Sequence, residues 1–336
     1  MKRKIAFCIF LFSVLCWSCN NDFDINDTWK DNTIVYGILN KADSLQIIRV
    51  SKSFLGKGNA YDMAQISDSI YYNKPVSVKL EEWLNGNLHK TIILHKDSSM
   101  ARDSGVFAYD KNYYFVTSEL LNTNATYKLL VQVNNKTVTG ETNLVNDFYM
   151  DVPSTINFST TGTIKIKITS SPYARIYQSF FRFYYYELTS TDTIKKYIDF
   201  VLPTYMTTTI DGGEIFNIEY PGARFYEYVA NTIQYNSNVI KRYAAKGSIV
   251  IYAFAGSNEL YAYMQASGPT SGLVLDKPIY SNIGNGIGLF TSRISKYMPA
   301  KSLSQRTVDS LAQGVYTKDL LFQTYWNTST VWDNFP

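Results

Sequence analysis

Residues 75–95, PVSVKLEEWLNGNLHKTIILH, decide the fold class of this chain. In the first half, Val76, Val78 and Leu80 alternate with polar side chains, which is the period-two pattern of a half-buried strand. Asn85-Gly86 is a strong hairpin signal, because both residues accept the positive φ of a tight two-residue turn. The residues after the turn return as a second strand. The stretch therefore predicts an antiparallel β-hairpin.

Short apolar runs of the same kind continue on both sides of this hairpin. The candidate strands of this region are residues 33–39, 45–54, 75–83, 88–95, 113–117, 127–133 and 136–144. About seven short alternating strands over roughly 110 residues are typical of an immunoglobulin-like β-sandwich. A transthyretin-like sandwich gives the same pattern. The sequence thus predicts a β-sandwich of one of these two kinds over residues 33–146.

A second β-rich region follows a boundary near residues 145–153. Ile164, Ile166 and Ile168 alternate with lysines, which predicts a half-buried strand. Residues 180–186 are apolar at nearly every position, which predicts a central strand packed on both faces. Further strands are expected at residues 194–202, 214–219 and 248–254, and helices at 225–234, 258–266 and 304–313. We therefore predict a larger β-sandwich domain with short helical insertions over residues 147–300, then a C-terminal helix and tail over residues 301–336.

The start of the chain predicts export. Three basic residues precede an apolar run of about a dozen residues, which is shorter than the roughly 20 that a membrane-spanning helix needs. Cys19 follows Ser18 directly after this run, and the arrangement resembles a bacterial lipobox, although Cys16 stands where an aliphatic residue is usual. We therefore expect a lipoprotein signal peptide over residues 1–18, lipid attachment at Cys19 and an acidic tether over residues 19–32.

The cysteines and the charge exclude several classes of protein. All three cysteines, Cys8, Cys16 and Cys19, lie in this leader, so the mature chain cannot form an internal disulfide or a zinc–thiolate site. The net charge of +4 comes from 32 basic and 28 acidic residues. Three of the basic residues belong to the leader, which leaves 29 against 28. A near-neutral chain lacks the electrostatic signature of a nucleic-acid-binding protein.

No motif predicts a metal or cofactor site. The acidic tether imitates the start of an EF-hand loop, but Asp27 replaces the turn glycine and Thr33 the bidentate glutamate. The two histidines, His89 and His95, would lie roughly 20 Å apart on one strand, too far to share a metal ion. Residues 284–288, GNGIG, lack the lysine of a phosphate-binding loop and predict a glycine-rich turn that leads into a strand.

The candidates for catalysis are weak. Glu81 and Glu82 would point to opposite faces of a strand, whereas glycoside hydrolysis needs two carboxylates that face each other. No Gly-x-Ser-x-Gly elbow accompanies the histidines. We therefore assign no catalytic residue, and expect that the chain is not an enzyme.

Two other groups of residues are candidates for binding or modification. Tyrosines cluster at Tyr71-Tyr72, Tyr113-Tyr114, Tyr184 to Tyr186 and Tyr261/Tyr263, and could stack on sugar rings, form a partner interface or fill strands. Asp-Ser/Thr-aliphatic tripeptides are similar to the periplasmic O-glycosylation signal of Bacteroidota. Their candidate acceptors are Ser44, Ser69, Thr193 and Ser310.

Three stretches together resemble a known family. They are residues 47–56, IIRVSKSFLG; residues 140–145, GETNLV; and residues 278–293, PIYSNIGNGIGLFTSR. They are similar to an uncharacterised Bacteroidota outer-membrane lipoprotein family, a domain of unknown function whose members often accompany TonB-dependent receptors. The Asn-Ile-x-Asn-Gly-x-Gly-x-Phe motif is the most specific part. No catalytic residue is attached to that family.

The sequence and the resemblance together lead to one expectation of function. We expect a non-enzymatic lipoprotein of the outer membrane, facing the cell surface or the periplasm, that acts as an accessory or ligand-binding component of a TonB-dependent uptake system. Its expected partners are the lipid bilayer, such a receptor or a glycan. The alternatives are a structural or adhesive cell-surface protein and, behind it, a carbohydrate-active hydrolase.

Overall fold

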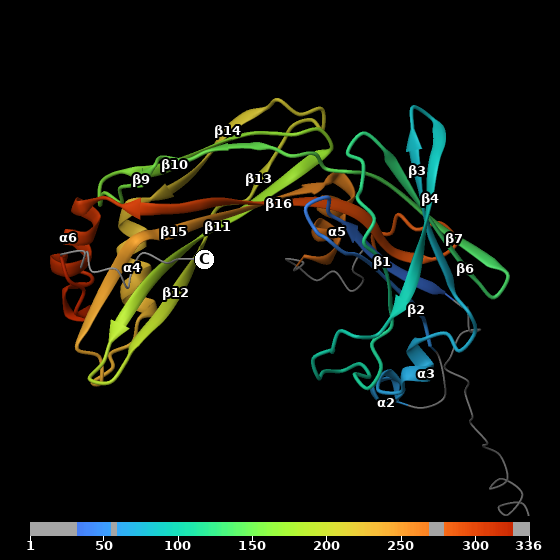
Figure 1. Cartoon of the computed structure of the whole chain (residues 1–336), viewed down its shortest axis with the longest axis horizontal. Helices are drawn as coiled ribbons and strands as arrows, with labels where there is room; N and C mark the ends of the chain where they lie inside the picture. The colour runs from blue at the N-terminus through green and yellow to red at the C-terminus, as the bar shows by residue number, and fades with distance from the viewer. Residues whose placement is uncertain (1–31, 55–58, 269–278, 325–336) are drawn as a thin grey trace, which may run out of the picture.

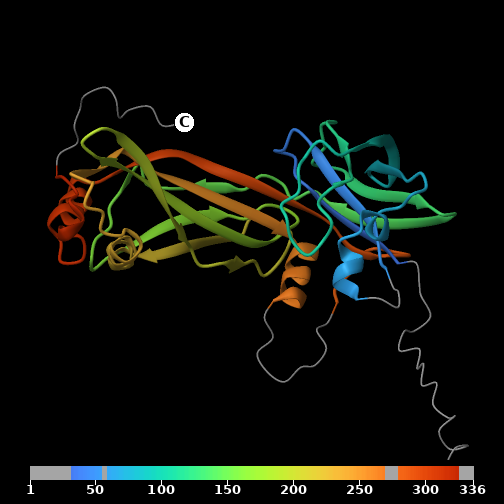
Figure 2. The ribbon, with the colours of Figure 1, turned by 90° about the horizontal axis from the view of Figure 1, so that it is seen from below.

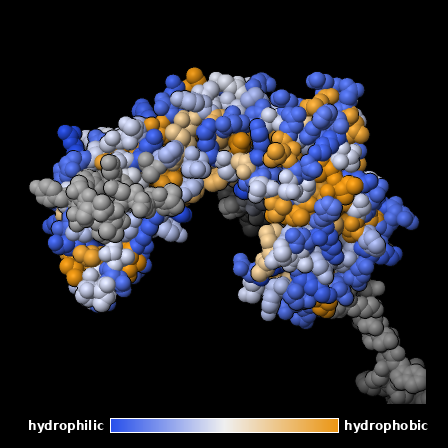
Figure 3. Space-filling model, in the orientation of Figure 1, coloured by the Kyte–Doolittle hydropathy of each residue, from blue (hydrophilic) through white to orange (hydrophobic). Residues whose placement is uncertain are grey.

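The structure is a computed structural model that describes residues 32–54, 59–268 and 279–324. The predicted signal peptide, Cys19 and all of the acidic tether except Asn32 lie outside the described residues. The chain is mainly β, with 47% of residues in strands and 15% in helices. Figures 1 and 2 show two lobes joined by the long strand β16 (Ile287–Leu303), and Figure 3 shows that the surface is deeply indented between them. We call the lobe that contains the earlier strands the first lobe, and the other the second lobe.

The first lobe is an antiparallel arrangement of seven strands around one core. Its strands are β1 (Thr33–Leu39), β2 (Gln46–Lys52), β3 (Ser77–Leu84), β4 (Asn87–Asp97), β5 (Tyr114–Thr117), β6 (Thr126–Val133) and β7 (Lys136–Asn143), with helices α2 (Ala60–Ala64) and α3 (Ser67–Ile70) between β2 and β3. The strand order is β1-β2-β5-β4-β3-β6-β7. Val35 and Ile48 at one end of this order and Leu129 and Val131 at the other are fully buried in the same core. The two ends of the sheet therefore face each other.

The predicted hairpin is confirmed. Strands β3 and β4 pair from Val78 opposite Leu94 to Leu84 opposite Asn87. The turn between them holds Asn85 at φ 50° and Gly86 at φ 78°, the left-handed values that an Asn-Gly turn permits. The strand predicted at residues 33–39 is present with the predicted ends, and the other strands predicted for this lobe are present with shifted ends.

The second lobe consists of a large sheet, a small sheet and helices. Its elements are β8 (Tyr149–Asp151), β9 (Thr155–Ile156), β10 (Thr163–Thr169), β11 (Ala174–Leu188), β12 (Thr193–Val201), β13 (Tyr205–Met206), β14 (Ile215–Pro221), α4 (Gly222–Thr232), β15 (Lys241–Ser257), α5 (Asn258–Ser267), α6 (Gln305–Gln313) and the 3-10 turn η1 (Lys318–Leu320). The large sheet has the order β12-β11-β15-β16, and the small sheet the order β14-β10-β8. The small sheet, α4 and α6 all contribute side chains to one core against the large sheet, among them Ile168, Phe225 and Leu311. They therefore cover one face of the large sheet.

Two of the three predicted helices begin at serine caps. Ser257 caps α5 by accepting from the Leu260 N–H, and Ser304 caps α6 by accepting from the Thr307 N–H at 3.2 Å. Gly314 follows the last residue of α6, whereas the helix predicted at residues 225–234 is α4, which begins earlier, at Gly222, without a side-chain cap. Within the described residues, no helix is long and apolar enough to cross a bilayer.

Strand β16 belongs to both lobes. Residues 287–292 pair parallel with β1, and residues 293–301 pair antiparallel with β15. The predicted glycine-rich turn leads into this strand, and Gly288 lies within it at φ +127°. A Cβ atom there would lie 2.0 Å from the carbonyl oxygen of Val35. Only glycine therefore lets β16 approach β1 so closely.

A buried ion pair fastens the end of the described chain to the second lobe. Arg242 on β15 is 2% exposed, and its Nε and Nη2 donate to Glu187 Oε1 on β11 at 2.9 and 2.8 Å. Its Nη1 donates to the carbonyl oxygen of Leu320 at 2.8 Å. The guanidinium thus connects β11, β15 and the turn η1.

Candidate functional site

Strand β11 divides its aromatic side chains between the two faces of the large sheet. Phe181, Phe183 and Tyr185 point into the core, whereas Phe180 and Tyr184 alternate with them and are only half-buried. The predicted central position of the strand is confirmed, because β11 lies between β12 and β15. The predicted packing on both faces is wrong, since the small sheet, α4 and α6 pack on the same side. We call the other side the open face.

An apolar row crosses the open face from edge to edge. Phe180 lies opposite Val201 of β12 and Tyr252 of β15, and Tyr252 lies opposite Tyr297 of β16. The rings of Phe180 and Tyr252 stack, with centroids 4.7 Å apart and an interplanar angle of 15°. Val201 and Tyr297 at the two ends are 80% and 69% exposed. Large apolar side chains therefore remain in contact with water along the whole row.

A paired charge lies next to this row. Arg182 donates from Nε and Nη2 to the two carboxylate oxygens of Asp199 at 2.6 and 2.8 Å. Its guanidinium also lies 4.0 Å from the ring centroid of Tyr197, close enough for a cation–π interaction. The hydrogen bonds to Asp199 raise the pKa of Arg182. The pair is planar and neutral overall, so it adds hydrogen-bonding groups without a strong field.

Further tyrosines complete the open face. Tyr184 contacts Tyr197 at a centroid distance of 6.1 Å, and Lys195 lies 4.6 Å from the Tyr184 ring. Burial, followed by the neighbouring Tyr184 hydroxyl, raises the pKa of Tyr252. The open face therefore presents aromatic rings from four neighbouring strands, with charged groups beside them.

Helix α5 covers only one end of the open face. Leu260 packs over Gly256, where a Cβ atom would lie 2.7 Å from Leu260 Cδ2. Tyr261 lies beside Arg175 of β11, and Tyr263 meets Tyr36 of the first lobe edge to face at 6.2 Å. The predicted pair Tyr261/Tyr263 thus connects the two lobes.

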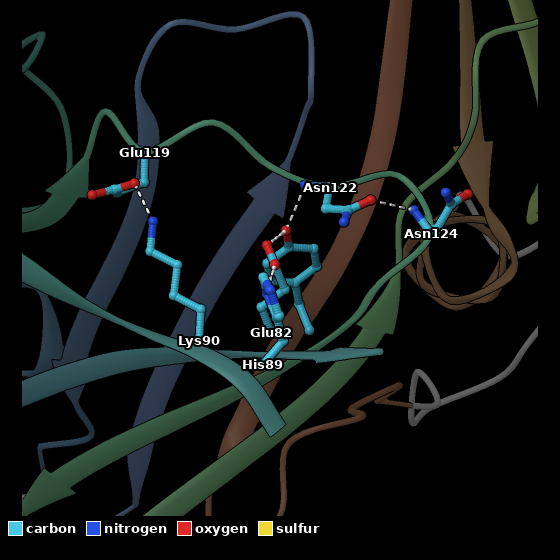
Figure 4. Close-up of polar contacts among 7 residues, drawn as sticks. Glu82, His89, Lys90, Glu119, Asn122 and Asn124 are labelled. Atoms are coloured by element: carbon cyan, nitrogen blue, oxygen red, sulfur yellow. Dashed lines mark hydrogen bonds and ion pairs between the residues drawn. The ribbon is translucent and has the colours of Figure 1, made fainter. Parts of the chain in front are cut away.

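A buried carboxylate in the first lobe unites two residues that the sequence analysis treated separately (Figure 4). Glu82 is 4% exposed and accepts from the Tyr127 hydroxyl at 2.5 Å, and its other oxygen lies 2.8 Å from His89 Nδ1. The Tyr127 hydroxyl in turn accepts from the backbone N–H of Asn122 at 2.7 Å. Desolvation, and then the bond to Glu82, raise the pKa of Tyr127. All three groups satisfy one another, so the arrangement stabilises the fold.

The remaining predicted residues are dispersed. His95 lies further along β4, and Glu81 turns away from Glu82 to accept from the Trp83 indole at 2.9 Å.

The candidate glycosylation acceptors differ in exposure. Ser44 and Thr193 are exposed, whereas Ser69 and Ser310 are half-buried. Tyr114 is buried, and its hydroxyl accepts from the Met100 N–H at 2.7 Å and lies 3.0 Å from Ser99 Oγ. The other tyrosines of these two clusters, Tyr71, Tyr72 and Tyr113, line one cavity. Within the described ranges, no group of three His, Cys, Asp or Glu side chains is arranged to hold a metal ion.

Sequence reasoning missed the open face as a site, although it singled out Tyr184. The signal was available in the composition of β11 and its neighbours, where aromatic residues occupy both strand parities. The sequence does not indicate on which face of the large sheet the small sheet, α4 and α6 pack.

Comparison with known proteins adds little to this description. No family model matches the chain, and no curated protein matches it. Among solved structures, it is similar to the C-terminal globular domain of an oligosaccharyltransferase from Pyrococcus abyssi, with 10% sequence identity and a TM-score of 0.23. The similarity covers 62% of this chain and 44% of that one. A similarity of this level carries no argument about fold or function.

Proposed function

We propose that this protein is a non-enzymatic accessory lipoprotein of the outer membrane that binds a protein partner, a TonB-dependent receptor, through the open face. The observation that carries the proposal is the row of Val201, Phe180, Tyr252 and Tyr297, which exposes apolar side chains across a whole sheet. Exposed apolar patches on a soluble lobe mark interaction surfaces.

The extent and composition of the open face favour a protein over a small molecule. Small ligands are usually held in concave pockets, whereas the apolar row extends across four neighbouring strands. Tyrosine, phenylalanine and arginine are the residues enriched at the centres of protein interfaces. Arg182, already paired with Asp199, would be buried against a partner without an unpaired charge.

The first lobe is proposed to be an immunoglobulin-like sandwich. Its strand order separates into β1-β2-β5-β4 and β3-β6-β7, which corresponds to the ABED and CFG order of constant-type immunoglobulin domains. Tyr127 stands near the start of β6, and its hydroxyl bonds back to the backbone of Asn122. This contact matches the tyrosine corner of that fold. Both observations favour the immunoglobulin-like form over the transthyretin-like one.

Membrane attachment is proposed from the sequence alone. Lipid on Cys19 would supply the anchor and residues 20–32 a tether. Replacing Cys19 with Ala is expected to release the protein from outer membranes into the soluble fraction. A Cys19→Ala variant that stays in the membrane like an integral lipoprotein would show that the anchor is misassigned.

A structural or adhesive role is the second candidate, and one observation favours it. Strand β12 is the terminal strand of the large sheet, so its outer backbone edge is available for a partner strand. Lys195 and Lys196 on the same strand oppose this reading, because lysines on an edge strand hinder strand addition.

The test is a mild-detergent pull-down of the tagged, full-length protein from the outer membranes of its own cells, quantified by mass spectrometry. The test variant is Val201→Ser/Tyr297→Ser, which removes the two ends of the row. The matched control is Tyr149→Ser/Ile215→Ser, which removes one tyrosine and one aliphatic residue, 63% and 61% exposed, from the outer face of the small sheet.

Three outcomes separate the possibilities. A TonB-dependent barrel that accompanies the wild type and the control in near-equal amount, but falls at least about tenfold with the test variant, supports the proposal. Equal recovery of the barrel with all three proteins overturns the open face as the contact. Recovery of the protein alone in every case overturns the partnership and moves the adhesive candidate forward.

A further inference from the structure

The first lobe contains a small cavity that is independent of the open face. Tyr71 and Tyr72, just after α3, line it together with Lys96 of β4 and Tyr113 beside β5. Its volume is about 150 Å³, which is room for on the order of ten waters. The cavity is therefore large enough for one small organic molecule and too small for a polymer chain.

Three lysines lie in or beside this cavity. Lys74 and Lys96 line it, and Lys52 lies 5.9 Å from the ring centroid of Tyr72. In the part of the chain that the structure describes, none of these three ammonium groups has an Asp or Glu oxygen within 4.0 Å. An anion beside these ammonium groups would therefore not compete with a described carboxylate for them.

One buried polar group in the wall has no partner. Tyr71 is 4% exposed, and its hydroxyl makes no hydrogen bond to any described residue. The hydroxyl oxygen has less than 1 Å² of accessible surface, so there is no room beside it for a ligand oxygen. The ring of Tyr71, and not its hydroxyl, therefore borders the cavity.

The aromatic part of the wall is fixed in place. Tyr113 meets Tyr71 edge to face at a centroid distance of 5.1 Å and an angle of 72°. Lys96 Nζ lies 3.6 Å from the centroid of Tyr113, which holds the ammonium group over the ring. Tyr72 is fastened through its hydroxyl, 2.9 Å from Thr33 Oγ1. Rings and charge are thus preorganised around one space.

We propose that this cavity binds a small carboxylate whose ring has an apolar face, a uronic acid being the simplest example. The ring of the ligand packs against the tyrosines, and its carboxylate lies beside the lysines. The site lies in the other lobe from the open face and does not depend on the proposed receptor.

The test is calorimetric titration of the full-length protein in detergent micelles with glucuronate, with glucose as the neutral comparison. Glucuronate is expected to bind and glucose to bind at least about tenfold more weakly, because a charge-assisted contact is lost. Lys96→Gln is expected to weaken glucuronate about tenfold, while Lys41→Gln, which removes an exposed lysine from the turn between β1 and β2, leaves binding unchanged.

A second variant tests whether the ring of Tyr71, and not its hydroxyl, forms the wall. Tyr71→Phe keeps the ring and is expected to leave the affinity for glucuronate unchanged and the melting temperature of the free protein unchanged or raised, because no hydrogen bond is lost. A loss of affinity would overturn this arrangement of the wall.

Three further results overturn the proposal as a whole. They are the absence of glucuronate binding, equal affinity for glucose and glucuronate, and displacement of glucuronate by inorganic phosphate at equal concentration. The last result would assign the lysines to simple anions.

Discussion

The two faces of strand β11 have nearly the same composition and different surroundings. Phe181, Phe183 and Tyr185 on one face are at most 6% exposed and contact the rings of α4 and the C-terminal turn. Phe180 and Tyr184 on the other face contact rings of the neighbouring strands β15 and β12. Aromatic content alone therefore does not distinguish a core face from a surface that is kept free.

The difference also shows in the charges of the sheet. The side chains of Arg242, at the start of β15, and Glu187 are 2% and 10% exposed. Those of Arg182 and Asp199 on the open face are about a quarter and a third exposed. An arginine–carboxylate pair is thus buried in the core in one place and lies on the surface in the other. Stability measurements can separate the two faces.

The largest expected effect is that of Phe183→Ala on the core face. Phe183 is 0% exposed and contacts Tyr185, Phe225 and Phe322, so its loss leaves a cavity. We expect the free energy of unfolding in urea to fall by about 3–5 kcal/mol. The comparison variant on the open face, Tyr184→Ala, should lower the free energy of unfolding by less than about 1 kcal/mol. Equal losses for the two variants would contradict the distinction between the faces.

Breaking the two ion pairs should give the next largest contrast. Arg242→Gln leaves Glu187 buried without its cation, and we expect a loss of about 3 kcal/mol. Arg182→Gln leaves Asp199 in contact with water, and we expect about 0.2–1 kcal/mol. Both values can be measured by urea unfolding at neutral pH. A large loss for Arg182→Gln would mean that the open face is structurally required.

Alkaline pH should weaken the core face. Burial, and then the nearby Glu187 charge, raise the pKa of Tyr185 to about 12. Between the unfolded pKa near 10 and this value, the unfolded chain loses the proton and the native state keeps it, so stability falls as pH rises. We expect Tyr185 to lower the free energy of unfolding by about 1 kcal/mol at pH 11 and not at all at pH 8. Tyr185→Phe should flatten the decrease between pH 10 and 12, and an unchanged slope would contradict the assignment.

The smallest expected effect on stability is that of Tyr297→Ser on the open face. Tyr297 is 69% exposed, and an exposed substitution of this kind changes the unfolding free energy by less than about 0.5 kcal/mol. Chemical unfolding would check this value. A loss above 2 kcal/mol would show that Tyr297 supports the sheet.

Much of the local structure could be predicted from the sequence, because local signals determine it. Alternation located β3 and β10, and the Asn85-Gly86 turn located the hairpin and the returning strand β4. Glu82 could have been recognised as buried, since it continues the inward parity of Val78 and Leu80. These features depend on residues that are close in the chain.

The open face and the tyrosine–lysine cavity could not be predicted, because distant segments create them. Whether Phe180 or Phe181 is buried depends on where β10, α4 and α6 pack, and strand period does not encode that side. Lys96 reaches Tyr113 and Tyr71 only through the sheet order. The parallel pairing of β16 with β1 likewise has no local signal.

The participation of β16 in both lobes has a consequence for the order of folding. Strand β1 is complete only when residues 287–292 lie beside it, although these residues are synthesised long after β1. Closing so long a stretch of chain is slow, and it comes late. A chain cut short before residue 287 would leave the Ile34–Leu39 edge unpaired, and such an edge recruits other chains into aggregates. An early strand is thereby completed by a much later one, so that a product cut short before β16 is distinguished by the exposed edge of β1.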